Sequence, residues 1–223
     1  RRANPRDDLV SILTGAKDAG MLEEFDVAES HGNTQFETTE IEMANDELTM
    51  MLVLLMVAGN ETTRNALSGA MELLIRNPEA RQALVEDPAR IPIAVEELLR
   101  LVSPVRSFAR TATRDYTLAG AEIREGQQVL MVYPSANRDE DVFDDAEALD
   151  LDRNPRHLAF GIGSHFCLGA NLARMELRVA LTELLSRLPD MHFATDGPVI
   201  RPHSLVRACT EMRVAYTPES QRV

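Results

Sequence analysis

The chain has 223 residues, 44% of them hydrophobic and 26% charged, and its formal net charge is −13. This composition is typical of a soluble globular protein, and the negative charge argues against nucleic acid or an anionic membrane as a partner. Two cysteines do not form a disulfide framework, the apolar run Leu48–Gly59 is too short to span a bilayer, and the N-terminus lacks the apolar centre of a signal peptide, so a cytoplasmic location is expected.

Two segments precede the first long helix. Leu9, Ile12 and Leu13 share one helical face and predict a short amphipathic helix over Asp8–Lys17. Residues 21–42 contain seven acids and no lysine or arginine, which is typical of a solvated irregular loop, with a docking or lid role as the alternative. We therefore expect residues 1–45 to form a helix and an acidic irregular segment, and residues 46–223 to form one domain.

A long helix is expected next. Asn45-Asp46-Glu47 supplies an N-cap and first-turn acids, and Asn77-Pro78 ends the helix after Ile75. Met50–Ala58 is apolar on every side, so we expect this helix to be central and buried. The run Ala58-Gly59-Asn60-Glu61-Thr62 follows, and a buried carboxylate there costs several kcal/mol unless it is paired or wet. The structural alternative is a glycine that packs against another helix and a threonine bonded to its own backbone.

Two short helices should follow, from Pro78 to Asp87 and from Pro92 to Ser103, each with a proline at its start. The second contains Glu97 and Arg100, which lie three residues apart and can pair. On an exposed helix such a pair contributes only about 0.3 kcal/mol.

Short strands are expected in the remaining segments. Val105–Ala112, Tyr116–Leu118 and Gln128–Tyr133 predict a small antiparallel sheet. Asn137–Arg153 is acidic and predicts an irregular segment, whereas Pro198–Tyr216 predicts a strand, a turn and a strand. Cys209 has no motif and is expected to be buried.

A glycine-rich segment with one cysteine lies before the last helix, which is expected over Ala170–Leu188. The segment is Phe160-Gly161-Ile162-Gly163-Ser164-His165-Phe166-Cys167-Leu168-Gly169, and its glycines let the backbone turn tightly against something flat. Leu168, Leu172, Met175 and Val179 recur at helical spacing, so Cys167 faces unpaired N–H groups that favour a thiolate. One thiolate suits haem iron, whereas zinc needs further ligands; the alternative for a lone cysteine is a buried hydrophobe.

The pattern Phe-Gly-x-Gly-x-His-x-Cys-x-Gly resembles the haem-binding signature of the cytochrome P-450 superfamily. Three further motifs stand in the family's order, namely Ala-Gly-x-Glu-Thr from Ala58, the pair Glu97-x-x-Arg100, and Arg110 on a strand. The resemblance covers most of residues 46–216. It implies a mainly α fold with small antiparallel β-sheets (α+β), in which a long central helix crosses over the cysteine loop and its helix. Family members are nearly twice this length, so we expect the C-terminal portion of a longer protein.

The resemblance also assigns roles to residues. Cys167 would be the axial ligand of haem b (iron protoporphyrin IX). The other residues expected to bind or approach the haem are Arg110 and His165 at its propionates, Phe160 beside the thiolate, and Gly161 and Gly169 where the backbone comes close. Glu61 and Thr62 would relay protons during oxygen activation. The expected buttress is Glu97, Arg100 and Arg153, with Arg138 as a weaker candidate for its third member, and the expected substrate wall is Ala58, Gly59, Val105, Leu205 and Val206.

The implied reaction inserts one oxygen atom of O2 into a C–H bond of an apolar small molecule. NAD(P)H would supply electrons through a ferredoxin reductase and a ferredoxin. Arg174 and Arg178 are expected to lie on an ordinary solvated face, with contact to an acidic ferredoxin as the alternative. Two other interpretations stay open: a haem-thiolate peroxygenase, against which Glu61 and Thr62 weigh, and a non-catalytic remnant or interaction module without haem.

Overall fold

The computed structural model describes residues 4–8, 10–12, 15, 23–24, 39–40 and 45–218. Two compact units divide the chain, residues 1–58 and residues 59–223, and the boundary falls inside helix α2 (Asn45–Arg76). The sequence predicts a division between residues 45 and 46, which stays a prediction. No helix among the described residues is long and apolar enough to cross a membrane.

The first unit agrees with expectation in its N-terminal helix and departs from it in the acidic segment. Residues 10–12 and 15 are helical, within the predicted N-terminal helix, but Leu9 and Leu13 lie outside the described residues. Strands β1 (Glu23–Glu24) and β2 (Thr39–Glu40) pair antiparallel inside the acidic segment that was expected to be irregular. The rest of that segment also lies outside the described residues.

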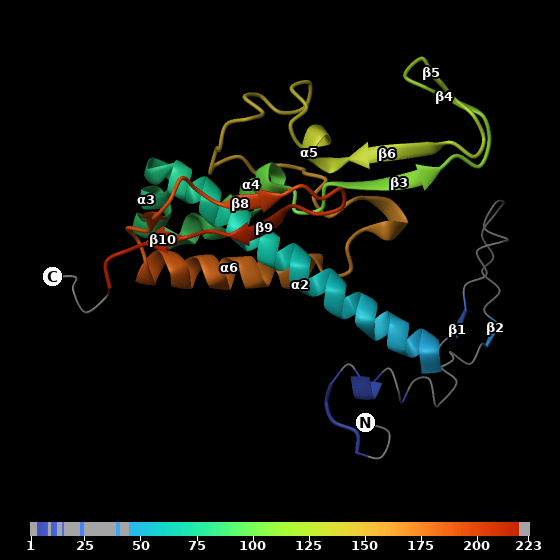
Figure 1. Ribbon diagram of the computed structural model, residues 1–223, viewed down its shortest axis with the longest axis horizontal. Helices are drawn as coiled ribbons and strands as arrows, with labels where there is room; N and C mark the ends of the chain where they lie inside the picture. Colours follow the sequence, from blue (N-terminus) through green and yellow to red (C-terminus); the bar gives the residue numbers. More distant parts are fainter. Residues whose placement is uncertain are drawn as a thin grey trace. The chain divides into compact units, whose positions relative to one another are not determined.

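The three longer helices that follow α2 in the second unit have the predicted order (Figure 1), whereas the short helices over Pro88–Arg90, Tyr133–Ala136 and Gly163–His165 were not predicted. After α2 come α3 (Pro78–Glu86), the short η2 (Pro88–Arg90), α4 (Ile91–Val102), α5 (Tyr133–Ala136), η3 (Gly163–His165) and α6 (Ala170–Arg187). Prolines in the first turns of α3 and α4 confirm the predicted helix starts to within a residue. Residues 137–153 form turns without regular structure, as predicted.

The core lies between the second half of α2 and helices α3, α4 and α6. Ala66, Ala70 and Leu74 recur every fourth residue on the buried face of α2. Leu177, Leu181 and Leu185 do the same on α6. The α6 stripe singled out from the sequence faces the other way, since Leu168, Leu172, Met175 and Val179 are exposed. Apolar residues occupy both faces of α6, so the period alone did not determine the buried one.

Among the described residues of the second unit, the strands form four antiparallel pairs. The pairs are β3 (Ser107–Thr111) with β6 (Gln128–Val132), β4 (Tyr116–Leu118) with β5 (Ala121–Ile123), β7 (His192–Phe193) with β10 (Val214–Ala215), and β8 (Val199–Arg201) with β9 (Ala208–Glu211). The sequence missed β5, and the expected single sheet at residues 105–133 is two pairs instead. Ala119 (φ 49°) and Gly120 (φ 83°) form the tight turn that sends the chain back immediately after β4.

The apolar first half of α2 is exposed, which corrects the expectation of a buried helix. Leu48 is buried, but Met50, Leu54 and Met56 each leave about two thirds of their surface in contact with solvent, at 65%, 67% and 68%. Burial of an all-apolar helix needs neighbours on every side. Within the described residues these side chains have no such cover.

Candidate functional site

The loop before α6 is shaped by glycines and closed by backbone hydrogen bonds. Gly161 (φ 71°) and Gly163 (φ 77°) adopt the left-handed conformation that favours glycine. The Cys167 N–H donates to the Phe160 carbonyl at 3.0 Å, and the Ala170 N–H donates to the Cys167 carbonyl at 3.2 Å. Cys167 is a half-buried free thiol at this closure. The loop therefore presents one sulfur atom from a tightly turned backbone directly before a helix.

Phe160 anchors the start of this loop. Its ring centre lies 5.7 Å from that of His157 and 6.3 Å from that of Phe166, and the Arg174 guanidinium stands over it at 4.7 Å. Phe160 also packs against the hydrophobic core. A guanidinium over an aromatic face is attracted by roughly 0.5–2 kcal/mol. Because the Phe160 carbonyl accepts the Cys167 N–H, these contacts also restrain the cysteine.

A hydrogen-bonded network around Glu96 supports Phe160 from α4 and α6. Arg174 donates through Nε and Nη2 to the two Glu96 carboxylate oxygens, each at 2.8 Å, and His157 Nε2 lies 3.2 Å from Glu96 Oε2. Burial raises the pKa of the Glu96 carboxyl. The hydrogen bonds from His157 and Arg174 lower this pKa by more than burial raises it, so the net result is a pKa of about 2. The bonds to Glu96 raise the pKa of the Arg174 guanidinium.

This network was not predicted from the sequence. Its members are far apart in the chain, and the signal available was a second acid next to Glu97 and an arginine on the cysteine's helix. Arg174 is turned toward Glu96, so the expectation of a solvated face is wrong for this residue. Arg178 is exposed, and its Nε donates to the Arg174 carbonyl at 3.2 Å.

The predicted buttress residues lie together. Glu97 and Arg100 are fully buried, and Arg100 donates Nε and Nη2 to the two Glu97 oxygens at 2.7 Å each. Arg153 Nε reaches Glu97 Oε1 at 3.2 Å. Arg138, the weaker candidate, pairs with Glu147 instead. Three backbone carbonyls accept the remaining Arg100 N–H groups, at Asn137, Ala146 and Ala148, so the pair holds the irregular segment against α4.

The two candidates for propionate binding project into solvent. Arg110 lies on β3 opposite Val129 of β6, and His165 ends η3. Both side chains are exposed. Neither makes a side-chain hydrogen bond or ion pair with another of the residues that the structure describes. The side-chain N–H donors of Arg110 and His165 are therefore available to an anionic ligand.

The α2 motif is accessible rather than buried. Glu61 pairs with Arg64 at 2.6 Å, and 43% of its side chain is exposed, which corrects the expectation of a buried carboxylate. Thr62 is half-buried. The buried Asn65 donates Nδ2 to the Glu61 carbonyl at 2.8 Å and accepts the Cys209 N–H at 3.0 Å, which fixes β9 beside this turn of α2. Cys209 itself is half-buried, not buried as expected.

A Cβ added at Gly59 would meet no atom within 4 Å, among the described residues. The sequence alternative of a helix-packing glycine therefore has no support here. Ala58, the other small residue of the motif, is exposed and belongs to the first unit.

Three predicted substrate-wall residues come from distant segments that the structure brings together. Val105 and Val206 form an isolated antiparallel bridge. The Arg106 N–H donates to the Leu205 carbonyl at 2.7 Å, and the Arg207 N–H donates to the Pro104 carbonyl at 2.8 Å. The start of β3 and the turn between β8 and β9 are thereby held side by side.

Comparison with known proteins places these motifs in a family. A family model described as cytochrome P-450 matches residues 24–189. The steroid C26-monooxygenase of Mycolicibacterium smegmatis is 40% identical over 222 residues, which cover 99% of this chain and 50% of the relative. The chain therefore spans about half the length of this curated relative.

Solved structures agree with the sequence matches. The tirandamycin C-bound P-450 monooxygenase TamI has a TM-score of 0.84 and 36% identity, covering 97% of this chain and 50% of TamI. A Bacillus megaterium cytochrome in complex with testosterone has a TM-score of 0.82 and 33% identity, covering 96% of this chain and 51% of that one. The mainly α fold with small antiparallel sheets is thus the fold of these relatives.

Proposed function

This chain belongs to the cytochrome P-450 family, and we propose that the protein containing it is a haem-thiolate monooxygenase that holds haem b through the sulfur of Cys167. The observation that supports this proposal most is a single half-buried thiol on a glycine loop closed against Phe160.

The residues at the loop fit a flat macrocycle. Gly169 has φ −86°, which any residue adopts, and a Cβ there would meet no described atom within 4 Å. Neither the backbone nor the packing of this chain explains that glycine, whereas close approach of a planar group does. Haem supplies four nitrogen ligands itself, so one protein sulfur is enough.

Other side chains have roles around the bound group. Arg110 and His165 would donate to the haem propionates, because both project exposed donors that have no partner among the described residues. Charge-assisted bonds of this kind are about twice as strong as neutral ones. Phe160, fixed by Arg174 and His157, would pack beside the thiolate.

When bound, haem with a thiolate ligand supplies reductive activation of O2, favoured by electron density from the sulfur. The Thr62 hydroxyl would donate a proton toward the oxygen-binding space, and the Glu61 carboxylate would replace it from solvent, since it is half exposed. Gly59 leaves room there. Val105, Leu205 and Val206 would form one apolar wall that orients the substrate C–H bond and excludes water.

We propose an apolar small molecule as the substrate. One relative is named for a steroid and another was solved with testosterone, which supports this class. Electrons would come from NAD(P)H through a ferredoxin reductase and a ferredoxin, in the cytoplasm.

The iron ligand is tested by the absorption spectrum of the reduced protein with carbon monoxide. The protein containing this chain should show the strongly red-shifted haem band of a thiolate ligand, and Cys167→Ser should lose it. Cys209→Ser is the matched control, because it removes the other half-buried thiol and should keep the band. Persistence of the band in Cys167→Ser would remove Cys167 from the iron, and its absence from the wild-type protein would support the remnant interpretation.

The proton relay is tested by the coupling of electrons to product. Thr62→Ala should divert most of the electrons from NAD(P)H to hydrogen peroxide, because the hydroxyl that delivers the proton is lost. Thr63→Ala removes the neighbouring half-buried hydroxyl and should leave coupling unchanged. Equal peroxide yield in wild type and Thr62→Ala would contradict the relay and favour the peroxygenase interpretation.

A further inference from the structure

The Glu96 network consists of Glu96, His157 and Arg174, and none of these residues is expected to touch haem, oxygen or substrate. Their side chains are 19%, 2% and 29% exposed, and they come from α4, the segment before the cysteine loop and α6. Charged groups in such surroundings cost free energy unless they are paired. The structure therefore keeps an ion pair and a histidine directly behind the loop that carries the thiol.

The hydrogen bonds of His157 determine its tautomer. Its Nδ1 accepts the Ala159 N–H at 3.1 Å, so the proton of the ring lies on Nε2, which donates to Glu96 Oε2 at 3.2 Å. His157 is neutral in this arrangement. Glu96 is ionised at neutral pH, because its pKa is lowered to about 2. The network thus carries one negative charge on Glu96 and one positive charge on Arg174.

The positive end of this pair faces the cysteine. The Arg174 guanidinium lies 4.7 Å from the centre of the Phe160 ring, and the Phe160 carbonyl accepts the Cys167 N–H at 3.0 Å. The hydrogen bonds to Glu96, and to a smaller extent the charge of Cys167, raise the pKa of the Arg174 guanidinium. Burial, His157 and Arg174 set the pKa of Glu96. The sulfur therefore acts on the cation of the pair rather than on the anion.

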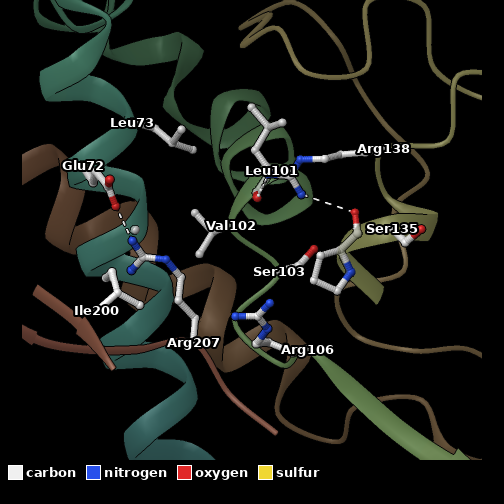
Figure 2. A pocket seen from close by; sticks show the side chains of 12 residues that line it. Glu72, Leu73, Leu101, Val102, Ser103, Arg106, Ser135, Arg138, Ile200 and Arg207 are labelled. Atoms are coloured by element: carbon white, nitrogen blue, oxygen red, sulfur yellow. Dashed lines mark hydrogen bonds and ion pairs between the residues drawn. The ribbon is translucent and has the colours of Figure 1, made fainter. Parts of the chain in front are cut away.

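Another glutamate–arginine pair of the second unit lies away from the cysteine loop. Arg207 pairs with Glu72 beside an open pocket that Arg106 also lines, between α2, the end of α4 and the turn between β8 and β9 (Figure 2). No residue of the loop 160–169 lines this pocket. The Glu96 network differs from this pair, because its arginine contacts a residue of the cysteine loop.

A charge beside the sulfur has a direct effect on electron uptake. One electron added to a haem–thiolate unit makes that unit more negative by one charge. A cation near the sulfur stabilises the reduced form and raises the reduction potential, and an anion there lowers it. Haem potentials respond to the hydrogen bonds, burial and charge around the axial ligand. Arg174 and Glu96 should therefore shift the potential in opposite directions.

We propose that Arg174 is a positioning residue that raises the reduction potential of the haem iron, with Glu96 opposing its charge and His157 orienting the Glu96 carboxylate. Arg174 acts through the Cys167 sulfur and the Phe160 ring and does not touch the haem. The inference rests on the proposed ligation of haem by Cys167. It adds a residue set that adjusts how readily the iron accepts an electron.

The test is the reduction potential of the haem-loaded protein that contains this chain, titrated with dithionite in the presence of redox mediators. Arg174→Gln should lower the potential, because the cation is lost. Glu96→Gln should raise it, because glutamine keeps an acceptor for His157 but removes the negative charge. The double variant should lie between the two. Arg178→Gln is the matched control, since it removes an exposed arginine one turn further along α6 and should leave the potential unchanged.

The signs of the two shifts separate charge from structure. Either substitution loosens the same network, so a purely structural role predicts shifts in one direction. Shifts of the same sign, or an Arg174→Gln potential equal to that of Arg178→Gln, would overturn the inference. Arg174→Lys keeps the cation and should restore most of the wild-type potential. If Glu96→Gln does not hold haem, equal potentials in Arg174→Lys and Arg174→Gln would exclude charge as the cause.

The carbon monoxide spectrum distinguishes failure of this inference from failure of the proposed function. The red-shifted band should be present in the wild type and in every variant of the network, because Cys167 stays in place. A wild-type protein without the band would overturn haem ligation by Cys167 and this inference together. A band in all variants with unmoved potentials would overturn the role of Arg174 alone.

Discussion

Two glutamate–arginine pairs with the same spacing lie on two helices of this protein in opposite surroundings. On α4, Glu97 and Arg100 are 2.7 Å apart with side chains 0% exposed. On α2, Glu61 and Arg64 are 2.6 Å apart with side chains 43% and 61% exposed. The two pairs have the same sequence spacing and nearly the same distance, so neither quantity explains a difference in their contribution to the stability of the fold. The pairs differ in how many other hydrogen-bonding groups they bind.

The α4 pair is the centre of a larger set of bonds. Glu97 also accepts from Arg153 and from the Asp150 N–H, and Arg100 donates to three carbonyls of the segment 137–148. The α2 pair joins two residues of one helical turn, and both side chains are exposed to solvent. Loss of Arg100 on α4 leaves the buried Glu97 with Arg153 as its remaining cationic partner, whereas loss of one partner on α2 leaves a solvated charge.

The largest expected effect is that of Arg100→Ala. It should lower the free energy of unfolding by about 3–5 kcal/mol, because it leaves Glu97 buried and three carbonyls without donors. Arg64→Ala, the matched change on α2, should cost only a few tenths of a kcal/mol. Urea unfolding followed by circular dichroism measures both. Equal losses in the two variants would show that burial does not distinguish the pairs.

Glu96 offers an intermediate case, because its side chain is 19% exposed and its pKa is lowered to about 2. A carboxyl with a lowered pKa stabilises the fold fully above its unfolded pKa, and the contribution is lost as the pH falls through the folded pKa. At neutral pH, Glu96→Gln should therefore cost up to about 3 kcal/mol.

This difference between wild type and Glu96→Gln should shrink as the pH falls from about 4.5 to about 2. Unfolding in urea at a series of pH values measures it. A difference that stays constant from pH 7 down to pH 3 would mean that the loss comes from packing and not from the carboxylate charge.

Effects smaller than that of Arg100→Ala, and of opposite sign, are expected at two glycines of α2. Gly69→Ala should cost about 1–3 kcal/mol, because its Cβ would lie 2.6 Å from Val102 Cγ1 and α2 and α4 must move apart. Gly59→Ala meets nothing within 4 Å among the described residues, so its better helix propensity should stabilise the fold by roughly 0.5–1 kcal/mol. Thermal unfolding checks both signs. Destabilisation by Gly59→Ala would reveal a packed neighbour at that turn.

Local signals predicted most of the elements. Prolines marked the starts of α3 and α4, and Asn77-Pro78 marked the end of α2. These residues act on the backbone of their own turn, so their effect does not depend on distant contacts. The hairpin β4–β5 shows the limit of this method, because its turn used Ala119 in a conformation that alanine rarely adopts.

Motifs that are continuous in the chain predict the cysteine loop and the Glu97–Arg100 pair. The family resemblance predicts Arg153 as the third member of the buttress, and its Nε lies 3.2 Å from Glu97 Oε1. The network of Glu96, His157 and Arg174 was missed, because three isolated residues in distant segments form no local pattern.

The sequence by itself determined the order of the helices, the glycine turns of the cysteine loop and the family to which the chain belongs, because each depends on neighbouring residues. Only the tertiary structure decided which face of α6 is buried, that Glu61 is exposed to solvent while Glu97 is buried, and that Arg106 and Arg207 share a pocket. These features depend on the burial and charge that distant segments impose, and the same residue pattern is compatible with either environment.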